Sequence, residues 1–374
     1  MNPATTKTIS LLLFILIGYL IRKKIKSKEQ RDGVKTLILS LALPATIFIA
    51  LLQIDFKSGL IVIPLLSLGF NITMHLFMDK LPLRAPLGIP LNQYRTLILL
   101  IPSLAPGLSC FPFIMEYSGQ DALAMAALAD VGNKVFVLII SYTIAMKWYF
   151  EVSRQDAPDR GSKMKGILQA LINEPINIVI VIAILMLSLG LTYSFFPEFM
   201  RLSIDRISLL MTPLVLLFIG MSVRLNWGQA RVISAALFFR SGVAFLISAL
   251  LLAIFPVADV PTALLIVVFP QSACSFWPYA HMSAVSQMEV SAQQPTKTFD
   301  LDFAMNVLAC SMPFSVVLIL VIYASGDFFT ATSHLYICAA ALLALAVLII
   351  AFSTQWVQIY RTNTATLENP QEKA

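Results

Sequence analysis

The sequence predicts an all-α polytopic membrane protein, built as an inverted repeat of five plus five transmembrane helices with one extra C-terminal helix. Composition is the first reason, because 58% of the 374 residues are hydrophobic and only 12% are charged. Soluble domains carry about 25% charged residues. Long apolar segments recur along nearly the whole chain, and a weak internal repeat places helix-breaking residues at matching positions. The net charge of +6 lies mostly in short connections between apolar segments, which argues against nucleic acid as a partner.

Apolar segments long enough to span a bilayer core of about 30 Å need roughly 20 residues. Eleven candidates follow in order: 8–21, 34–53, 59–78, 95–115, 121–147, 167–193, 205–222, 232–255, 261–282, 298–323 and 332–356. They predict a first repeat over 1–147, a cytoplasmic linker over 148–166, a second repeat over 167–323, an additional transmembrane helix over 324–356 and a cytoplasmic tail over 357–374, which is polar and disordered from about Thr362.

The charges of the connections predict the orientation. Twenty basic residues fall in segments on one side of the membrane, and only Lys7, Lys57, Arg201 and Arg206 fall on the other. Because cytoplasmic loops carry an excess of Lys and Arg, the N-terminus is expected outside and the C-terminus in the cytoplasm. The positive cluster at 22–24 follows the first apolar run, so that run is a retained span and not a cleaved signal.

Four pairs of motifs recur in the same order, 166 to 173 residues apart. They match Gly18 with Gly190, Leu41–Pro44 with Leu210–Pro213, Phe111–Phe113 with Trp277–Tyr279, and Asp130 and Asn133 with Asp302 and Asn306. Each copy has five spans, an odd number, so the second copy starts from the opposite side of the membrane. Inverted repeats with helix breaks at matching positions are typical of secondary transporters.

The breaks are the stretches Pro102–Pro112 (PSLAPGLSCFP) and Phe269–Pro278 (FPQSACSFWP), whose prolines cannot continue an α-helix. Free backbone groups at mid-membrane are costly unless they line a cavity or meet a ligand. We therefore expect two broken crossover helices, with half-helix N-termini facing an anion and carbonyl ends facing a cation. Proline kinks packed against neighbours are the alternative. The predicted substrate-binding residues are Ser109, Cys110, Pro112, Gln271, Ser272, Cys274, Ser275 and Pro278.

Ionisable residues inside apolar spans are expensive and usually functional. Asp130 and Lys134 lie four residues apart on one helical face, and Lys134 is about 20 Å from either end of its span. A structural ion pair and a proton or substrate switch are both open for this pair. Arg240 is expected to snorkel to the cytoplasmic surface. The predicted coupling residues are Asp130, Asn133, Lys134, Asp302 and Asn306, with H⁺ or Na⁺ as the coupling ion.

No residues form a recognisable cofactor or metal site. The four cysteines lie within apolar segments and are expected to be small buried side chains. No cysteine–histidine cluster has metal-ligand spacing, and no P-loop is present. No nucleophile and base stand out within the spans either. We therefore expect neither a cofactor nor an enzymatic activity.

The chain resembles the auxin efflux carrier family of membrane permeases and, more distantly, the bile acid:sodium symporters. The best local matches are Phe111–Asn133, Pro213–Ser222 and Asn173–Pro175, and the resemblance covers about residues 8–323. It implies a ten-helix crossover fold in which a scaffold domain and a transport domain move against each other. It also implies organic anions such as auxin, malate and malonate as substrates. The short linker resembles that of bacterial members.

One position departs from the family pattern. In the family an Asn usually lies seven residues before the crossover proline and contacts substrate, whereas this chain has Ala105 there. The corresponding position of the second repeat is Cys274 or Ser275, so neither Asn is kept. The expected fold is unaffected, but the family's mode of carboxylate binding does not transfer.

These features predict a secondary active transporter of a small organic anion such as a carboxylate, with alternating access around a midplane crossover. It would be a multi-pass protein of the cell membrane, in the bacterial inner membrane, with the lipid bilayer and the substrate as partners. A homodimer stays open. The missing Asn pair and the added helix keep a membrane sensor or channel-like member of the same fold as an alternative, and an intramembrane enzyme is a third.

Overall fold

The computed structural model describes residues 3–25, 27–53, 62–81, 84–153, 175–222, 229–255, 257 and 259–368, with only the backbone over 352–368. All regular structure in these ranges is helical. Seven helical segments are long and apolar enough to cross a membrane: Glu29–Gln53, Val62–Lys80, Phe111–Ser153, Glu198–Met221, Ala230–Ile254, Leu301–Ala324 and Thr332–Ala351. Shorter apolar helices cover Ile9–Ile21, Ile178–Ser188 and Val260–Gln271. The all-α membrane class is thereby confirmed.

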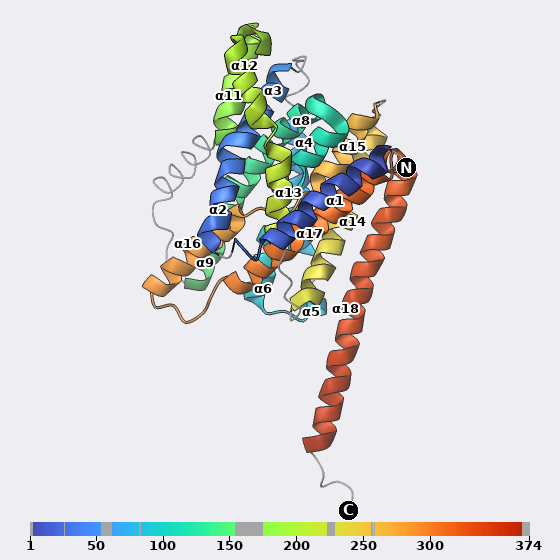
Figure 1. The fold of residues 1–374 in the computed structure, drawn as a ribbon. Coiled ribbons are helices and arrows are strands. Elements are labelled where there is room, and N and C mark those ends of the chain that lie inside the picture. The colour runs from blue at the N-terminus through green and yellow to red at the C-terminus, as the bar shows by residue number, and fades with distance from the viewer. Residues whose placement is uncertain are drawn as a thin grey trace, which may run out of the picture.

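The helices follow one another from the N-terminus to the long C-terminal helix (Figure 1). Their bounds are α1 Pro3–Ile21, α2 Lys28–Leu37, η1 Ile38–Ala42, α3 Leu43–Gln53, α4 Val62–Lys80, α5 Arg84–Leu87, α6 Leu91–Leu100, α7 Pro106–Ser109, α8 Phe111–Val135, η3 Phe136–Ile140, α9 Ser141–Ser153, α11 Pro175–Ser188, η4 Tyr193–Phe195, α12 Glu198–Ser208, α13 Met211–Ser222, α14 Ala230–Ile254, α15 Val260–Val268, η6 Phe269–Gln271, α16 Trp277–Ser291, α17 Leu301–Ala324, η7 Phe328–Thr330 and α18 Thr332–Glu368. Most of the expected linker and the start of the sixth span, residues 154–174, lie outside the described residues.

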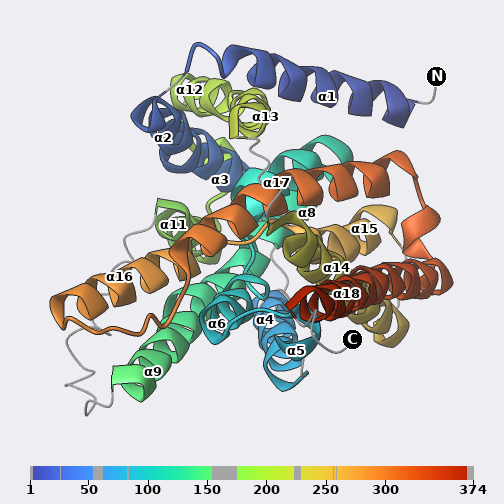
Figure 2. The same ribbon diagram turned by 90° about the horizontal axis from the view of Figure 1, so that it is seen from below.

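The helices form two layers (Figure 2). The support layer consists of α1, α2, η1, α3, α11, α12 and α13, in which α1 packs on α13 and α3 packs on α11 and α12. The crossover layer consists of α4, α6, α7, α8, η3, α9, α14, α15, η6, α16 and α17, in which α8 packs on α4 and α15, α17 on α6, and α16 on α9. Contacts of α3 with α8, of α1 with α17 and of α13 with α8 join the two layers.

Glycines allow the helices α1 and α13 to approach closely. A Cβ atom at Gly18 would overlap the carbonyl oxygen of Leu217, and one at Gly220 would overlap the carbonyl oxygen of Ile15. Small residues at helix interfaces let backbones meet, which is a main source of association inside a bilayer. Gly18 and Gly220 therefore fix the closest contact within the support layer.

Gly119 divides α8 into two helices. Its φ of 84° and ψ of −171° are not helical, and glycine adopts a positive φ without the steric cost of a Cβ. Asn133 Oδ1 lies 3.1 Å from the amide nitrogen of Leu104. A straight helix would carry Asn133 about 33 Å away from Phe111, so the chain must turn back at Gly119. The expected fourth and fifth spans are thus separate, although no coil joins them.

The last helix, α18, is longer than expected. It extends over 37 residues to Glu368 and projects beyond the other helices at its C-terminal end (Figure 1). The helix therefore continues past residue 356 into the expected tail, and the expectation of disorder from about Thr362 is wrong for residues 362–368. The segment is polar but contains neither proline nor glycine before Pro370, and polar residues without a helix breaker can continue a helix. In its apolar part, α18 packs mainly on α14.

Candidate functional site

The two broken helices meet and hydrogen-bond to each other. The first break lies between the end of α6 and the start of α7, and the second lies between η6 and α16. The amide nitrogen of Ala105 donates to the carbonyl oxygen of Ala273 at 2.7 Å. A backbone bond between two breaks so distant in sequence shows that they cross in contact.

Two serine hydroxyls complete the crossing. Ser109 Oγ accepts a hydrogen bond from the amide of Ala273 at 2.9 Å and donates to the carbonyl of Ala105 at 2.8 Å. Ser103 Oγ accepts from the amide of Ser275 at 2.9 Å. Both serines are fully buried. The hydroxyls therefore replace partners that the backbone loses where a helix breaks, as a low-dielectric interior requires.

The side chain of Asn133, on α8, hydrogen-bonds to backbone groups of the first break. Its Nδ2 donates to the carbonyl of Leu104 at 2.9 Å and to Asp130 Oδ1 at 2.8 Å. Its Oδ1 accepts from the amide of Leu104 at 3.1 Å and from Asn71 Nδ2 at 3.1 Å. Asn71 Nδ2 also donates to the carbonyl of Pro102 at 2.7 Å. This amide pair holds the unwound backbone of the first break open.

Asp130 and Lys134 form a buried ion pair. Their charged atoms, Asp130 Oδ2 and Lys134 Nζ, are 3.3 Å apart, and both side chains are about 5% exposed. Because Asn133 bonds both Asp130 and Leu104, the pair is connected to the first break through one side chain. The geometry allows a structural pair and a titrating switch alike.

Arg240 is the most informative residue that the sequence reasoning misplaced. It lies near the middle of α14 and is fully buried, so the expectation that it snorkels to the surface is wrong. Its Nε donates to the carbonyl of Ile101 at 2.8 Å, and its Nη2 donates to the carbonyls of Ser272 and, at 3.5 Å, of Ser103. Nη1 has no partner, and no carboxylate within the described residues pairs with this guanidinium.

The other predicted substrate-binding residues lie at or beside the crossing. Cys110 Sγ is 3.9 Å from the carbonyl of Val268, Gln271 Nε2 donates to the carbonyl of Ser241 at 3.2 Å, and the amide of Cys274 donates to Ser311 Oγ at 3.3 Å. Ser272 donates its hydroxyl to the carbonyl of Phe269. Pro112 and Pro278 are buried at the second positions of α8 and α16. The structure thus gathers all eight of these residues in one region.

Asp302 and Asn306 lie apart from that region. Asp302 is exposed in the first turn of α17. Asn306 Nδ2 donates to Gln229 Oε1, at the start of α14, at 2.8 Å. The two residues match Asp130 and Asn133 in sequence, but none of their side-chain hydrogen bonds within the described residues reaches a break.

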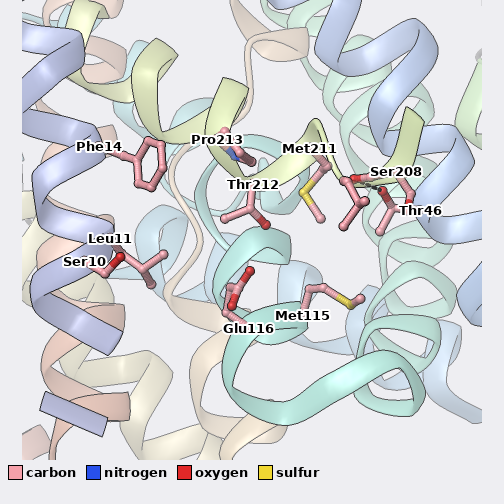
Figure 3. Close-up of a pocket in the computed structure, with 11 residues that line it drawn as sticks. Ser10, Leu11, Phe14, Thr46, Met115, Glu116, Ser208, Met211, Thr212 and Pro213 are labelled. Carbon is pink, nitrogen blue, oxygen red and sulfur yellow. Dashed lines mark hydrogen bonds between the residues drawn. The ribbon is translucent and has the colours of Figure 1, made fainter. Parts of the chain in front are cut away.

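A cavity of about 270 Å³ lies between the two layers (Figure 3). Its polar lining comes from α1, α3, α8 and the junction of α12 with α13, and includes Ser10, Thr46, Glu116 and Thr212. Figure 3 shows Glu116 and Thr212 facing each other across it. Glu116 lies one turn beyond Pro112 on α8, so this part of the cavity wall belongs to the same half-helix as the first break.

The first turns of the half-helices α8 and α16 are already partly hydrogen-bonded. The side chains of the N-cap residues Cys110 and Phe276 accept no bond, but the carbonyl of Cys110 accepts from the amide of Phe113 at 3.0 Å, and Ser275 Oγ accepts from the amide of Trp277 at 3.3 Å. Lys35 Nζ, from α2 in the support layer, lies 4.7 Å from the centre of the Phe276 ring. Helix N-termini carry about half a positive charge, and Lys35 adds a cation beside one of them.

The fold and this site define a polytopic membrane protein organised around a buried crossing of two broken helices. Comparison with known proteins gives it no narrower class, since the chain matches no protein-family profile and no curated protein is detectably similar to it. Its function must therefore be argued from the geometry of the crossing. Ser109 and Ser275 were predicted from the sequence. Ser103 was not, although it lies in the same break as Ser109, and neither was Asn71, which lies in another span with no charge or proline beside it.

Proposed function

We propose that the protein is a secondary active transporter of a small organic anion, working by alternating access around the crossing. The observation that carries the proposal is the direct hydrogen bonding of the two breaks through Ala105 and Ala273. Such irregular backbone at membrane depth is tolerated where it is buried in protein or lines a cavity. Secondary transporters place their substrate sites at such discontinuous helices.

The pattern of helix contacts supports an inverted repeat of five plus five helices. Under the repeat, the first and seventh spans should pack as the sixth and second do, and α1 packs on α13 as α11 packs on α3. Likewise α8 packs on α15 as α17 packs on α6, and α4 packs on α8 as α14 packs on α17. Matched contacts of this kind are expected from a pseudo-two-fold axis in the membrane plane.

An anionic substrate is favoured by the ends of the half-helices. The N-termini of α8 and α16 offer partial positive charge, although Ser275 Oγ already accepts from the first amide of α16. Lys35, on the opposing layer, lies beside the N-terminus of α16 and would attract a carboxylate. Glu116 has the opposite sign, so we place the anion at the half-helices and treat the cavity beside Glu116 as the approach to them.

The size of the cavity supports a small substrate, because about 270 Å³ is at the lower end of ligand sites. Its location between the support and crossover layers is where movement of one layer against the other would open and close a path. Membership of the auxin efflux carrier family, a place in the cell membrane with the N-terminus outside, and coupling through Asp130 and Lys134 belong to the same proposal.

Uptake of labelled carboxylates into proteoliposomes tests this function. A panel of mono- and dicarboxylates is offered under an imposed gradient, and at least one should accumulate above protein-free liposomes. Saturation and competition by an unlabelled analogue separate a carrier from a channel. If no carboxylate is taken up in either orientation of the gradient, the transporter hypothesis fails and the sensor alternative is favoured.

The crossing itself is tested by Pro112→Ala and Pro278→Ala. Each proline stands at the second position of a half-helix, and alanine there restores an N–H and lets the helix extend into the break. We expect at least a tenfold loss of uptake, equivalent to about 1.4 kcal/mol, with near-normal folded yield. Pro261→Ala is the matched control, because Pro261 holds the same position in α15 but is exposed. Wild-type uptake by both variants would leave the prolines as mere kinks.

A further inference from the structure

The carbonyl ends of both broken helices converge on one guanidinium. Ile101 is the C-cap of α6 and Ser272 is the C-cap of η6, and the carbonyls of both accept hydrogen bonds from Arg240. The Ser103 carbonyl, inside the first break, is the third acceptor. Arg240 comes from α14, which contributes to neither break. Arg240 therefore holds the two breaks together through hydrogen bonds from a separate helix.

The charges at this point balance without any further ion. A helix C-terminus carries about half a negative charge, so the two ends together offset the single positive charge of Arg240. This explains how the guanidinium is fully buried while no carboxylate among the described residues pairs with it. Hydrogen bonds from a charged donor to carbonyl oxygens add to the balance.

Carbonyl ends of broken helices are also where such carriers coordinate Na⁺. Here the oxygens that would ligate the ion already accept from Arg240. A sodium ion on the same oxygens would lie about 4 Å from the guanidinium carbon. At an effective dielectric constant near 20, repulsion between two unit charges at that distance lowers affinity by roughly a thousandfold.

We propose that Arg240 is a built-in cation that occupies the cation position of the crossing, so that the protein binds no sodium there and is not driven by a sodium gradient. This inference rests on the proposed transport function, because a coupling ion has a role only in a transporter. It excludes, as the coupling ion, a sodium ion bound at these carbonyl oxygens. The free half of the crossing, at the N-termini of α8 and α16, is then left to the anion alone. Arg240 is a positioning residue, since its three hydrogen bonds all go to backbone carbonyl oxygens.

Sodium binding to the purified full-length protein tests the inference without any knowledge of the substrate. Binding of ²²Na⁺ and the thermal unfolding midpoint are measured in sodium chloride and in N-methylglucamine chloride at equal ionic strength. For the wild type we expect no saturable ²²Na⁺ binding and the same midpoint in both salts. Arg240→Ser opens the carbonyl cluster, so it should bind ²²Na⁺ and unfold at a higher temperature in sodium.

Two further variants make the result specific. Arg240→Lys keeps the charge and should remain indifferent to sodium, and Arg231→Ser, at the exposed start of the same helix, should behave as the wild type. Saturable ²²Na⁺ binding by the wild type would overturn the inference, as would a folded Arg240→Ser without a sodium response. If Arg240→Ser gives no folded protein in either salt, the wild-type and Arg240→Lys measurements decide. Absence of carboxylate uptake would refute transport while leaving the sodium result intact.

Discussion

Asp130 contacts two side chains, and a substitution at Asp130 affects the two contacts differently. Its Oδ1 accepts from Asn133, which supports the first break, while its Oδ2 faces Lys134 at 3.3 Å. Asp130→Asn keeps an acceptor for Asn133 but removes the charge opposite Lys134. If proton exchange at this carboxylate drives transport, the variant should lose gradient-driven accumulation and retain downhill exchange. The measurement is uptake against pH, normalised to folded protein.

A purely structural pair gives another outcome. Removing one partner of a buried ion pair costs about 3–5 kcal/mol, so folded yield should drop and the remaining protein should keep its pH dependence. Asp302→Asn is the matched control, because Asp302 and Asn306 match Asp130 and Asn133 in the sequence pattern but Asp302 is exposed. Normal yield together with unchanged uptake and pH dependence in Asp130→Asn would remove this carboxylate from the mechanism.

The sequence alone predicts those site residues that stand out by their type or their spacing. Prolines and serines in an apolar break point to the crossing, and Asp130 with Lys134 is recognisable from its spacing. Arg240 was equally visible as a charge within an apolar span, but snorkelling depends on which way a helix faces, and sequence periodicity does not fix that for a helix that is apolar all round. Asn71 could be recognised only once its partner Asn133 was placed beside it.

The packing of α1 on α13 depends on two glycines. Gly18→Ala and Gly220→Ala would each drive a methyl group into a carbonyl oxygen of the opposing helix. Overpacking of this kind costs about 1–3 kcal/mol, so both variants should lower the thermal unfolding midpoint. Gly69→Ala in α4 is the control, because a Cβ there meets no atom within 4 Å and alanine favours a helix. A midpoint for Gly220→Ala equal to that of Gly69→Ala would contradict the close contact.

That a segment is helical was easier to predict than where each helix turns or ends. Every expected span contains helix within the described residues, with interruptions that include the two breaks, because a long apolar run leaves few other choices in a bilayer. The turn at Gly119 and the continuation of α18 to Glu368 were harder to place. The first depends on one backbone conformation, and the second on a polar stretch that lacks a breaker.

For the molecule as a whole, orientation is the property to test. In a background with the four native cysteines replaced, Gly33→Cys should be labelled only from the cytoplasm, and Asp259→Cys only from outside. Gly33 has open space around it, and Asp259 is the exposed N-cap of α15. The basis is the excess of Lys and Arg in one set of connections. Labelling at position 33 by an impermeant reagent added outside would overturn the orientation and with it the inverted arrangement.

The neighbours of a helix are predictable from the sequence only where a motif suggests them. The matching motifs Leu41–Pro44 and Leu210–Pro213 led us to compare the two segments, and the structure places residues next to them in contact, since Thr46 Oγ1 donates to the carbonyl of Ser208 at 3.3 Å. The packing of α18 was not predictable, since no motif match in the sequence suggested its neighbour. Its position became known only from its contact with α14 at Gly242, where Leu343 and Ala339 leave no room for a Cβ.

Because of that contact, α18 would move together with α14. The helix is joined to α14, and α14 carries the arginine that holds both breaks. At 1.5 Å per residue its 37 residues measure about 55 Å, nearly twice the thickness of a bilayer core. A small tilt of the crossover layer would therefore displace the C-terminal end of α18 further than it displaces the residues at the crossing. A fluorophore attached there, paired with one on the support layer, would convert a motion at mid-membrane into a distance measured in water.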